Sequence, residues 1–135
     1  MIVVDASAMI YALANDQEIG DRVRGALSMH QEWVGPAHLT AELAHGLRGM
    51  VRGGKIEQDR AESALREYFD LDVQLIASDF DAVERAWKLR HNLSAYDALY
   101  VALAEQHRLP LLTTDARIEA SGVARCEIMT VRSEA

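Results

Sequence analysis

The sequence predicts a single α/β domain, with a central, mostly parallel sheet of about four to five strands flanked by helices. Two observations carry this prediction. Short apolar or β-branched runs alternate with longer helical patterns along the chain, which is typical of parallel strands joined by crossover helices. The length of 135 residues suits one domain with one core, and the sequence contains no repeat, low-complexity segment or linker. We therefore expect residues 1–135 to form one domain.

The first half of the chain begins with a β-branched run and continues with helical patterns. Strands are expected at Ile2–Val4 and Trp33–Val34, the second ended by the breaker pair Gly35–Pro36. Apolar residues at helical spacing predict four helices, at Ala8–Leu13, Gln17–Met29, Leu39–Met50 and Ile56–Phe69. Gly53–Gly54 should end the third helix, and either Tyr68 or Phe69 should face the core from the fourth.

The second half alternates in the same way. Strands are expected at Val73–Ile76, Leu111–Thr114 and Ile128–Val131. Helices are expected at Asp79–Leu93, Ser94–Gln106 and, as a short element, near Ile118. In the first of these helices, the stripe that we expect to face the core consists of Phe80, Val83, Trp87 and Leu93.

Composition limits the functions that are open to the chain. The 14 basic and 21 acidic residues give a net charge of −7, which argues against a protein held to nucleic acid by charge alone. A nuclease is not excluded, because divalent metals supply positive charge. The single cysteine, Cys126, excludes an internal disulfide and a thiolate zinc set. The sequence has no signal-peptide pattern and no apolar run near the roughly 20 residues of a membrane span, so we expect a cytoplasmic protein without a membrane partner.

Four acidic residues stand where a parallel sheet would gather them. Asp5 ends the first strand, Asp115 follows the fourth, and Glu42 and Asp97 lie in the first turns of helices. Each alone is equally well explained as a helix cap or a partner of the helix dipole. Ligands of open parallel sheets bind beyond the carboxyl ends of the strands, however, and four carboxylates gathered there would repel one another without cations. Oxygen-only ligands select Mg²⁺ or Mn²⁺ over zinc.

Other chemical motifs are weak. His38, Glu42 and His45 do not have zinc-protease spacing, and no glycine-rich phosphate loop is present. The basic residues Arg48, Arg52 and Lys55 follow Glu42 along its helix and just beyond it. They are either a solvated helix face or a group that steers a phosphate backbone toward the acids.

Four motifs together resemble a known family. They are Val4-Asp5-Ala6-Ser7-Ala8, Thr40-Ala41-Glu42, the helix of Ser94 to Ala104 around Asp97, and Leu112-Thr113-Thr114-Asp115. In this order and spacing they resemble the PIN-domain ribonucleases, and the chain length resembles the VapC-type toxin branch of that family. The resemblance extends from residue 2 to about residue 131.

The resemblance implies a metal-dependent endoribonuclease that hydrolyses RNA phosphodiester bonds and acts as the growth-inhibiting toxin of a toxin–antitoxin pair. It implies that Asp5, Glu42, Asp97 and Asp115 are catalytic and hold one or two Mg²⁺ or Mn²⁺ ions. Ser7 and Thr113 match hydroxyl positions that support the acids by hydrogen bonds. It further implies a homodimer and a small antitoxin protein as partners, whereas phosphate contacts of Arg48, Arg52 and Lys55 are a hypothesis from charge alone.

Two alternatives come from other protein classes, and a third is a PIN-like domain without catalysis. A haloacid-dehalogenase-like phosphatase also begins with a strand-end Asp, but it needs an acid where Ser7 stands. A phospho-receiver domain needs a Lys after a late strand, and no Lys follows Lys88. A non-catalytic, PIN-like binding domain stays open and is opposed by the intact set of acids. RNA cleavage that requires metal and stops with chelator separates these alternatives.

Overall fold

Five short strands form one all-parallel sheet in the computed structural model, which describes residues 1–132. The strand order is β3-β2-β1-β4-β5. The strands are β1 (Ile2–Val4), β2 (Trp33–Pro36), β3 (Gln74–Ile76), β4 (Leu111–Thr113) and β5 (Ile128–Thr130). The prediction of a mostly parallel sheet in an α/β domain is confirmed, and residues 133–135 lie outside the described residues.

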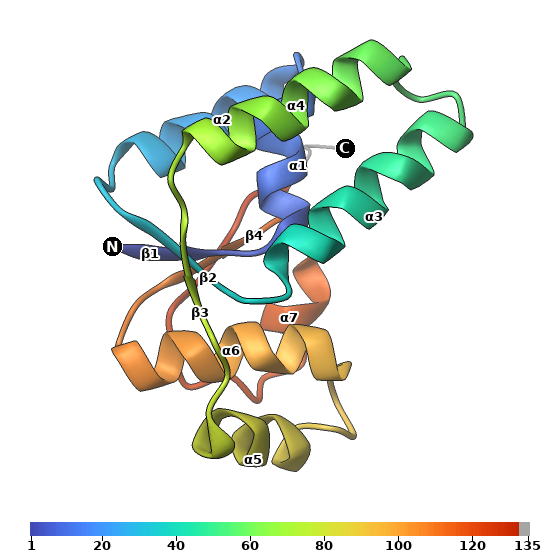
Figure 1. Ribbon diagram of the computed structural model, residues 1–135. Helices are drawn as coiled ribbons and strands as arrows, with labels where there is room; N and C mark the ends of the chain where they lie inside the picture. Colours follow the sequence, from blue (N-terminus) through green and yellow to red (C-terminus); the bar gives the residue numbers. More distant parts are fainter. Residues whose placement is uncertain (133–135) are drawn as a thin grey trace.

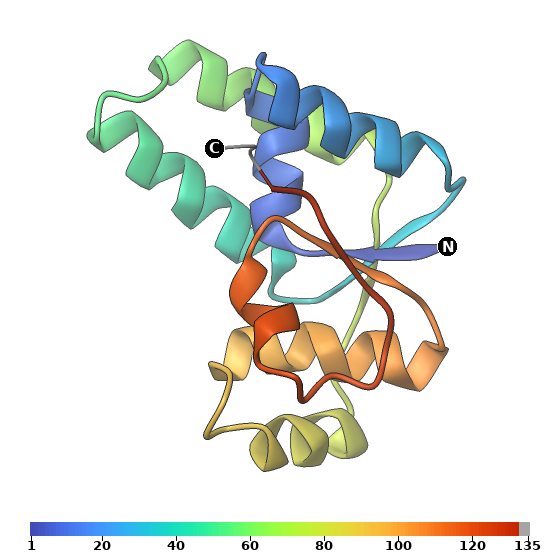
Figure 2. The same ribbon diagram turned by 180° about the vertical axis from the view of Figure 1, so that it is seen from behind.

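Helices cover both faces of the sheet (Figure 1). The first four helices, above the sheet in that view, are α1 (Ala6–Ala14), α2 (Glu18–Ser28), α3 (Leu39–Arg52) and α4 (Gln58–Asp70). The other three are α5 (Phe80–Lys88), α6 (Ala95–His107) and α7 (Ala116–Ala120). The opposite view shows how the chain passes from α7 into its last strand beside β4 (Figure 2). Within residues 1–132, no helix is long and apolar enough to cross a membrane.

The direction of strand addition reverses at β1. From β1 the chain adds β2 and then β3 on one side, whereas β4 and β5 lie on the other. Val3 is therefore paired with Val34 on one side and with Leu111 on the other. In open α/β sheets the crevice at such a reversal, outside the carboxyl ends of the strands, is where ligands bind. Here that point lies between the end of β1 and the end of β4.

The core explains why the central strands read as continuous apolar runs. All three residues of β1 are fully buried, as expected for a strand with helices on both faces. Tyr100, Val101 and Leu103 of α6 are buried against this sheet, together with the small residues between them. The short side chains of α6 allow the helix to lie close to the strands and fix the position of its first turn.

One predicted helix is shorter than expected and faces the other way. The helix expected at Asp79–Leu93 ends at Lys88, and Phe80, Val83 and Trp87 are 75%, 49% and 66% exposed instead of buried. Leu93, the fourth residue of the expected stripe, is buried as predicted but lies beyond the helix. The opposite, small-residue side of α5, with Ala82 and Ala86, is buried, and α5 packs extensively on α6. Helical spacing identifies an apolar side of a helix but not which side contacts the rest of the protein.

The expected strand break at Gly35–Pro36 is also wrong, because both residues continue β2 and pair with β3. A Cβ atom at Gly35 would lie 2.6 Å from the Leu39 side chain, so glycine allows α3 to begin directly against the strand end. Of the two aromatic residues at the end of α4, Tyr68 is buried and Phe69 is 68% exposed.

Candidate active site

Asp5 lies at the carboxyl end of β1 and caps α1. Its side chain is 4% exposed, and Oδ1 accepts hydrogen bonds from the Ala8 amide at 2.9 Å and from the Ser7 hydroxyl at 2.7 Å. Oδ2 accepts a short hydrogen bond from the Thr113 hydroxyl. Burial raises the pKa of the Asp5 carboxyl to about 6, although these hydrogen bonds oppose the shift. Asp5 is therefore fixed in direction but lacks a countercharge that would offset its burial.

The hydroxyls of Ser7 and Thr113 tie the two sides of the strand reversal together. Thr113, the last residue of β4, is fully buried, and its hydroxyl also accepts a hydrogen bond from the Asp115 amide at 2.9 Å. The Ser7 hydroxyl accepts from the Thr114 amide at 3.1 Å. Each hydroxyl thus contacts Asp5 and also the backbone that leads to Asp115. These contacts set the position of one carboxylate relative to the backbone of the other.

Glu42 lies in the first turn of α3, beside two aromatic residues. Its Oε1 atom is 3.3 Å from Nε2 of His38, but without hydrogen-bond geometry. These two atoms and the Tyr100 hydroxyl are buried without a hydrogen-bond partner among the described residues. Burial raises the pKa of the Glu42 carboxyl, but the polar contacts with His38 and Tyr100 outweigh it, so the pKa lies below its ordinary value.

The Tyr100 hydroxyl remains protonated beside Glu42. Burial, followed by the nearby Glu42 carboxylate, raises the pKa of Tyr100 above its ordinary value. A protonated hydroxyl is a hydrogen-bond donor, and a buried donor without a partner is costly. The combination of an unpartnered carboxylate oxygen, an imidazole nitrogen and a hydroxyl marks this side of the site as polar and ready to bind a polar group.

Asp97 lies in the first turn of α6, which Ser94 caps by accepting a hydrogen bond from the Asp97 amide at 3.2 Å. Burial raises the pKa of the Asp97 carboxyl, and the charges of Asp115 and Glu42 raise it further. Asp97 in turn helps to raise the pKa of Asp5. The carboxyl groups are thus close enough to repel one another, and we call Asp5, Glu42, Asp97 and Asp115 the acid cluster.

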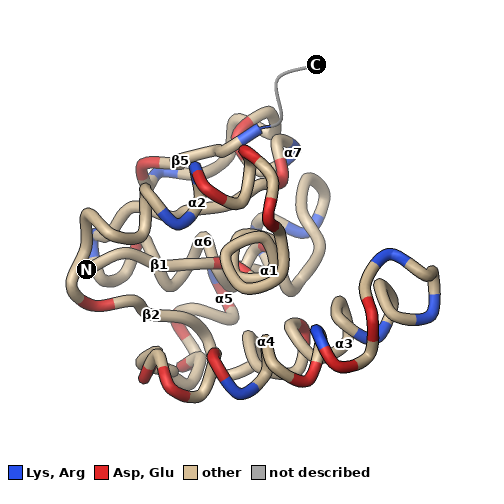
Figure 3. The backbone as a smooth tube through the Cα atoms, turned by 90° about the horizontal axis from the view of Figure 1, so that it is seen from above, with Lys and Arg blue, Asp and Glu red and all other residues tan. Residues whose placement is uncertain are grey.

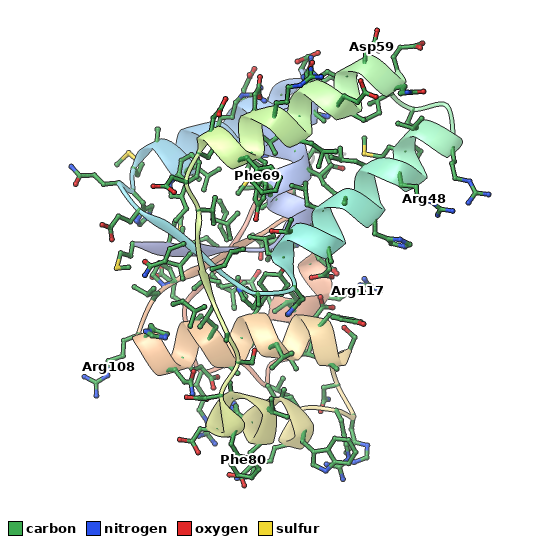
Figure 4. The ribbon with its side chains drawn as sticks, viewed as in Figure 1. Arg48, Asp59, Phe69, Phe80, Arg108 and Arg117 are labelled. Carbon is green, nitrogen blue, oxygen red and sulfur yellow. The ribbon has the colours of Figure 1, made fainter. Side chains whose placement is uncertain are left out.

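Asp115 has the chain's own counterion. It caps α7, and the Arg117 guanidinium donates to Oδ1 from Nε at 3.0 Å and to Oδ2 from Nη2 at 2.8 Å. These hydrogen bonds lower the pKa of the Asp115 carboxyl against the effect of partial burial. The Arg117 side chain is itself 86% exposed, and its charge interacts with Asp97 in the first turn of α6 (Figure 4).

The acid cluster fits a hard cation by donor chemistry, although its side chains are not arranged as a finished ligand set. Within residues 1–132, no three His, Cys, Asp or Glu side chains are placed to hold one ion. The cluster nevertheless offers carboxylate oxygens only, one of them the unpartnered Oε1 of Glu42, and burial disfavours the charge on Asp5 and Asp97. Mg²⁺ and Mn²⁺ prefer oxygen ligands, and either ion would relieve the repulsion.

The structure does not bring Arg48, Arg52 and Lys55 into the acid cluster. All three are exposed, and Arg48 points outward from α3 (Figure 4). At a rise of about 1.5 Å per residue, Arg52 lies roughly 15 Å along the helix from Glu42. Basic segments gather toward the end of α3 and its connection to α4 (Figure 3). Any contact of these residues with a ligand is therefore at a distance from the acids.

Sequence reasoning missed three residues that contact the acid cluster: His38, Tyr100 and Arg117. Each had a local signal. His38 precedes Glu42 by four residues, the spacing of neighbours on a helix face. Tyr100 follows Asp97 by three residues and carries a hydroxyl on an otherwise apolar helix, and Arg117 is two residues beyond Asp115.

Fold and site together define a class of protein: an all-parallel α/β domain with an oxygen-lined acidic site where strand addition reverses. Residues 2–123 match the family model of the PIN domain. The chain therefore belongs to the PIN-domain family, as its motifs predicted.

Individual relatives agree with this assignment. The chain is 39% identical over 130 residues to ribonuclease VapC1 of Mycobacterium tuberculosis, covering 96% of this chain and 97% of the relative. It is 38% identical over 131 residues to ribonuclease VapC9 of the same organism, covering 97% and 98%. A toxin–antitoxin complex from Klebsiella pneumoniae has the same fold, with a TM-score of 0.64, 21% identity and coverage of 96% and 97%.

Proposed function

We propose that this chain is a metal-dependent endoribonuclease that hydrolyses RNA phosphodiester bonds and acts as the toxin of a toxin–antitoxin pair. The observation that carries the proposal is the acid cluster at the strand reversal, with Asp5 buried and held by two hydroxyls. The names of the full-length relatives, ribonucleases VapC1 and VapC9, support the same activity. The haloacid-dehalogenase-like alternative is not favoured, because the chain belongs to another family. A binding-only role is not favoured either, because these relatives are named ribonucleases.

Asp5, Glu42, Asp97 and Asp115 would hold the metal. A bound Mg²⁺ or Mn²⁺ supplies positive charge that stabilises the transition state of phosphodiester hydrolysis and lowers the pKa of water. Asp5 contributes a carboxylate whose direction is fixed by Ser7, Thr113 and the Ala8 amide. Glu42 contributes a carboxylate held near His38 and Tyr100.

Two groups of the chain are placed to handle charge and protons. The Asp97 carboxyl lies in the first turn of α6, close enough to Asp115 for the two charges to repel, so both acids are placed to hydrogen-bond to attacking water. Asp97 and Asp115 remain alternative water-positioning residues in this proposal. The exposed Arg117 guanidinium is near enough to Asp115 and Asp97 to meet a phosphate drawn to the cluster.

The direct test uses the purified 135-residue chain and short, unstructured RNA. We expect cleavage with Mg²⁺ or Mn²⁺, none with chelator, and a raised melting temperature when Mn²⁺ is added without RNA. Asp59→Asn is the matched control, since Asp59 is an acid in the first turn of α4 far from Arg117 (Figure 4). If neither ion supports cleavage or shifts the melting temperature, the proposal is wrong.

The proposal includes an antitoxin partner and a homodimer, and it places the protein in the cytoplasm, where an RNA substrate is present. A solved toxin–antitoxin complex of the same fold supports the antitoxin, whereas the homodimer follows from the family resemblance. Light scattering of the chain alone, and again after co-expression with the protein encoded beside it, tests both. A monomer in each sample would contradict them.

We also propose that Arg48, Arg52 and Lys55 contact phosphates of longer RNA. Each phosphate contact on single-stranded nucleic acid contributes about 0.7 to the slope of log affinity against log salt concentration. Replacing all three by Ala should lower that slope by about 2 for a long RNA and leave a very short RNA unaffected. An unchanged slope would show that these residues are only a solvated helix face.

A further inference from the structure

Tyr96 is an exposed aromatic residue that directly adjoins the acid cluster. Its side chain is 58% exposed, and it precedes Asp97 in the first turn of α6. Its ring centroid lies 5.3 Å from that of His38, whose Nε2 atom is 3.3 Å from Oε1 of Glu42. Phe69, Phe80 and Trp87 are also exposed, but they lie on α4 and α5.

The Tyr96 ring is supported from behind by other rings. His38 packs between Tyr96 and Tyr100, with centroid distances of 5.3 Å and 5.0 Å. Tyr100 is 1% exposed, so the series of rings runs from the core to the surface. A ring held in this way loses little conformational freedom when a ligand packs on its outer side, and this favours binding.

The charge of the chain makes such a ring useful for RNA. With a net charge of −7 and four carboxylates gathered at the site, the protein repels the phosphates that it is proposed to cleave. The basic residues Arg48, Arg52 and Lys55, at the end of α3 and just beyond it, lie at a distance from the acid cluster. Stacking of a base on an aromatic ring is independent of net charge and contributes binding wherever a base is unpaired.

We propose that Tyr96, supported by His38, is a stacking platform for an unpaired nucleobase next to the phosphate that occupies the acid cluster. The inference rests on the proposed ribonuclease function and adds a substrate-binding residue to it. It requires a substrate with an unpaired base that is free to leave its neighbours. An apolar side chain of a protein partner would use the same ring, and the measurements below distinguish the two.

The test measures binding of a short, unstructured RNA that carries the fluorescent base 2-aminopurine, with Ca²⁺ in place of Mg²⁺. Stacking on the ring should quench the fluorescence of the base. Tyr96→Ala should abolish this quenching and weaken binding by about 5- to 100-fold, by the same factor at low and high salt. Tyr96→Phe and Tyr96→Trp should bind like the wild type, whereas Tyr96→Leu should resemble Tyr96→Ala.

The chain offers a matched control in Phe69→Ala. Phe69 is 68% exposed, and its ring lies 5.3 Å from that of the buried Tyr68, so it repeats the packing of Tyr96 on His38 away from the acids. Phe69→Ala should leave binding and quenching unchanged. Melting curves with chelator verify that each variant is folded, and Tyr96→Phe and Tyr96→Leu replace Tyr96→Ala if it is not.

The failure of this inference is distinguishable from failure of the proposed function. If the wild type cleaves RNA, and Tyr96→Ala or Tyr96→Leu binds RNA as well as the wild type does, only the stacking platform is overturned. A Tyr96→Ala variant that binds RNA normally but no longer binds the antitoxin assigns the ring to a protein partner and also overturns it. A wild-type protein that neither binds nor cleaves RNA overturns both proposals.

Discussion

Asp5 and Asp115 stand on opposite sides of the strand reversal and carry the same carboxylate in contrasting surroundings. Asp5 is 4% exposed, is held by hydroxyls and a backbone amide, and has a pKa raised to about 6 by burial. The Asp115 side chain is 21% exposed and bonded to the Arg117 guanidinium, which lowers its pKa. Both lie within reach of one site, but among residues 1–132 a countercharge is bonded to Asp115 and none to Asp5.

The difference indicates how an acidic site is kept folded without its metal. Neutral donors fix the direction of the buried carboxylate but do not remove the cost of its charge, so its proton is held more tightly. The partly buried Asp115 carboxylate gives up its proton more readily, because the Arg117 guanidinium donates hydrogen bonds to it. Asp97 resembles Asp5 in having a raised pKa, and Glu42 resembles Asp115 in having a lowered one. A metal ion would therefore offset the cost of the charges on Asp5 and Asp97. At Asp115 and Glu42 it would compete with the partners that these carboxylates already have.

The largest expected effect is on the rate of RNA cleavage, and it is the same for Asp5 and Asp115. Asp5→Asn and Asp115→Asn should each lower the rate of RNA cleavage by about 100- to 10,000-fold, because each removes a charge that the reaction requires. Initial rates with saturating Mn²⁺ measure this effect, and Asp59→Asn should retain the wild-type rate. Near-normal cleavage by either site variant would remove that residue from the catalytic set.

The second prediction separates the two sides by their pH dependence. The folded protein holds the Asp5 proton up to about pH 6, whereas the unfolded chain releases it near 3.8. Folding therefore takes up a proton between these values, and stability falls as the pH rises through this window. In chelator, the free energy of unfolding of the wild type, relative to that of Asp5→Asn, should fall by about 2 kcal/mol from about pH 4.5 to about pH 7.5.

Asp115→Asn is the comparison for this measurement. Because the Asp115 pKa is lowered, its stabilising contribution is lost only below the ordinary range of an aspartate, and from about pH 4.5 upward the difference from the wild type should stay constant. Urea unfolding curves at matched pH values give both differences. Parallel curves for wild type and Asp5→Asn would mean that the Asp5 carboxyl titrates normally.

The third prediction tests the hydroxyls that connect the two sides. Thr113→Val keeps the shape of a fully buried side chain but removes the donor to Asp5 and the acceptor for the Asp115 amide. Mn²⁺ affinity should fall by about 10- to 100-fold, as is typical when a partner of a metal-binding carboxylate is lost. Calorimetric titration measures it, and Thr114→Val is a neighbouring control. Unchanged affinity with a lower melting temperature would limit Thr113 to a structural role.

Sequence reasoning predicted the parallel sheet and the four acids because both follow from local order along the chain. A strand-end aspartate such as Asp5 is visible as a charge directly after a buried run. The outward-facing Phe80 and Trp87 were not predictable, since a helix with apolar residues on one side and small residues on the other is able to pack on either. The contact of Asp5 with Thr113, 108 residues away, depends on strand order; it was expected from the family resemblance and not from the local order of residues.

The smallest expected effect concerns the cation that distinguishes Asp115 from Asp5. Arg117 donates to both carboxylate oxygens of Asp115 and therefore competes with a metal ion for their lone pairs. Its side chain is 86% exposed, so solvent weakens the ion pair and limits its effect. Arg117→Gln should therefore raise Mn²⁺ affinity, by no more than about fivefold. The helix cap survives, because the backbone amide of residue 117 still donates to Asp115.

The same substitution should weaken RNA binding, since it removes a positive charge beside the acid cluster. Opposite changes in the two affinities are not expected from general damage to the site, which would lower both. Arg117→Lys retains the charge without the paired hydrogen bonds and should bind RNA like the wild type. Arg60, on α4, pairs with Asp16 at 2.8 Å, away from the acid cluster. Arg60→Gln should therefore change neither affinity. A fall in Mn²⁺ affinity in Arg117→Gln would show that the guanidinium helps to position Asp115 for the metal instead of competing with it.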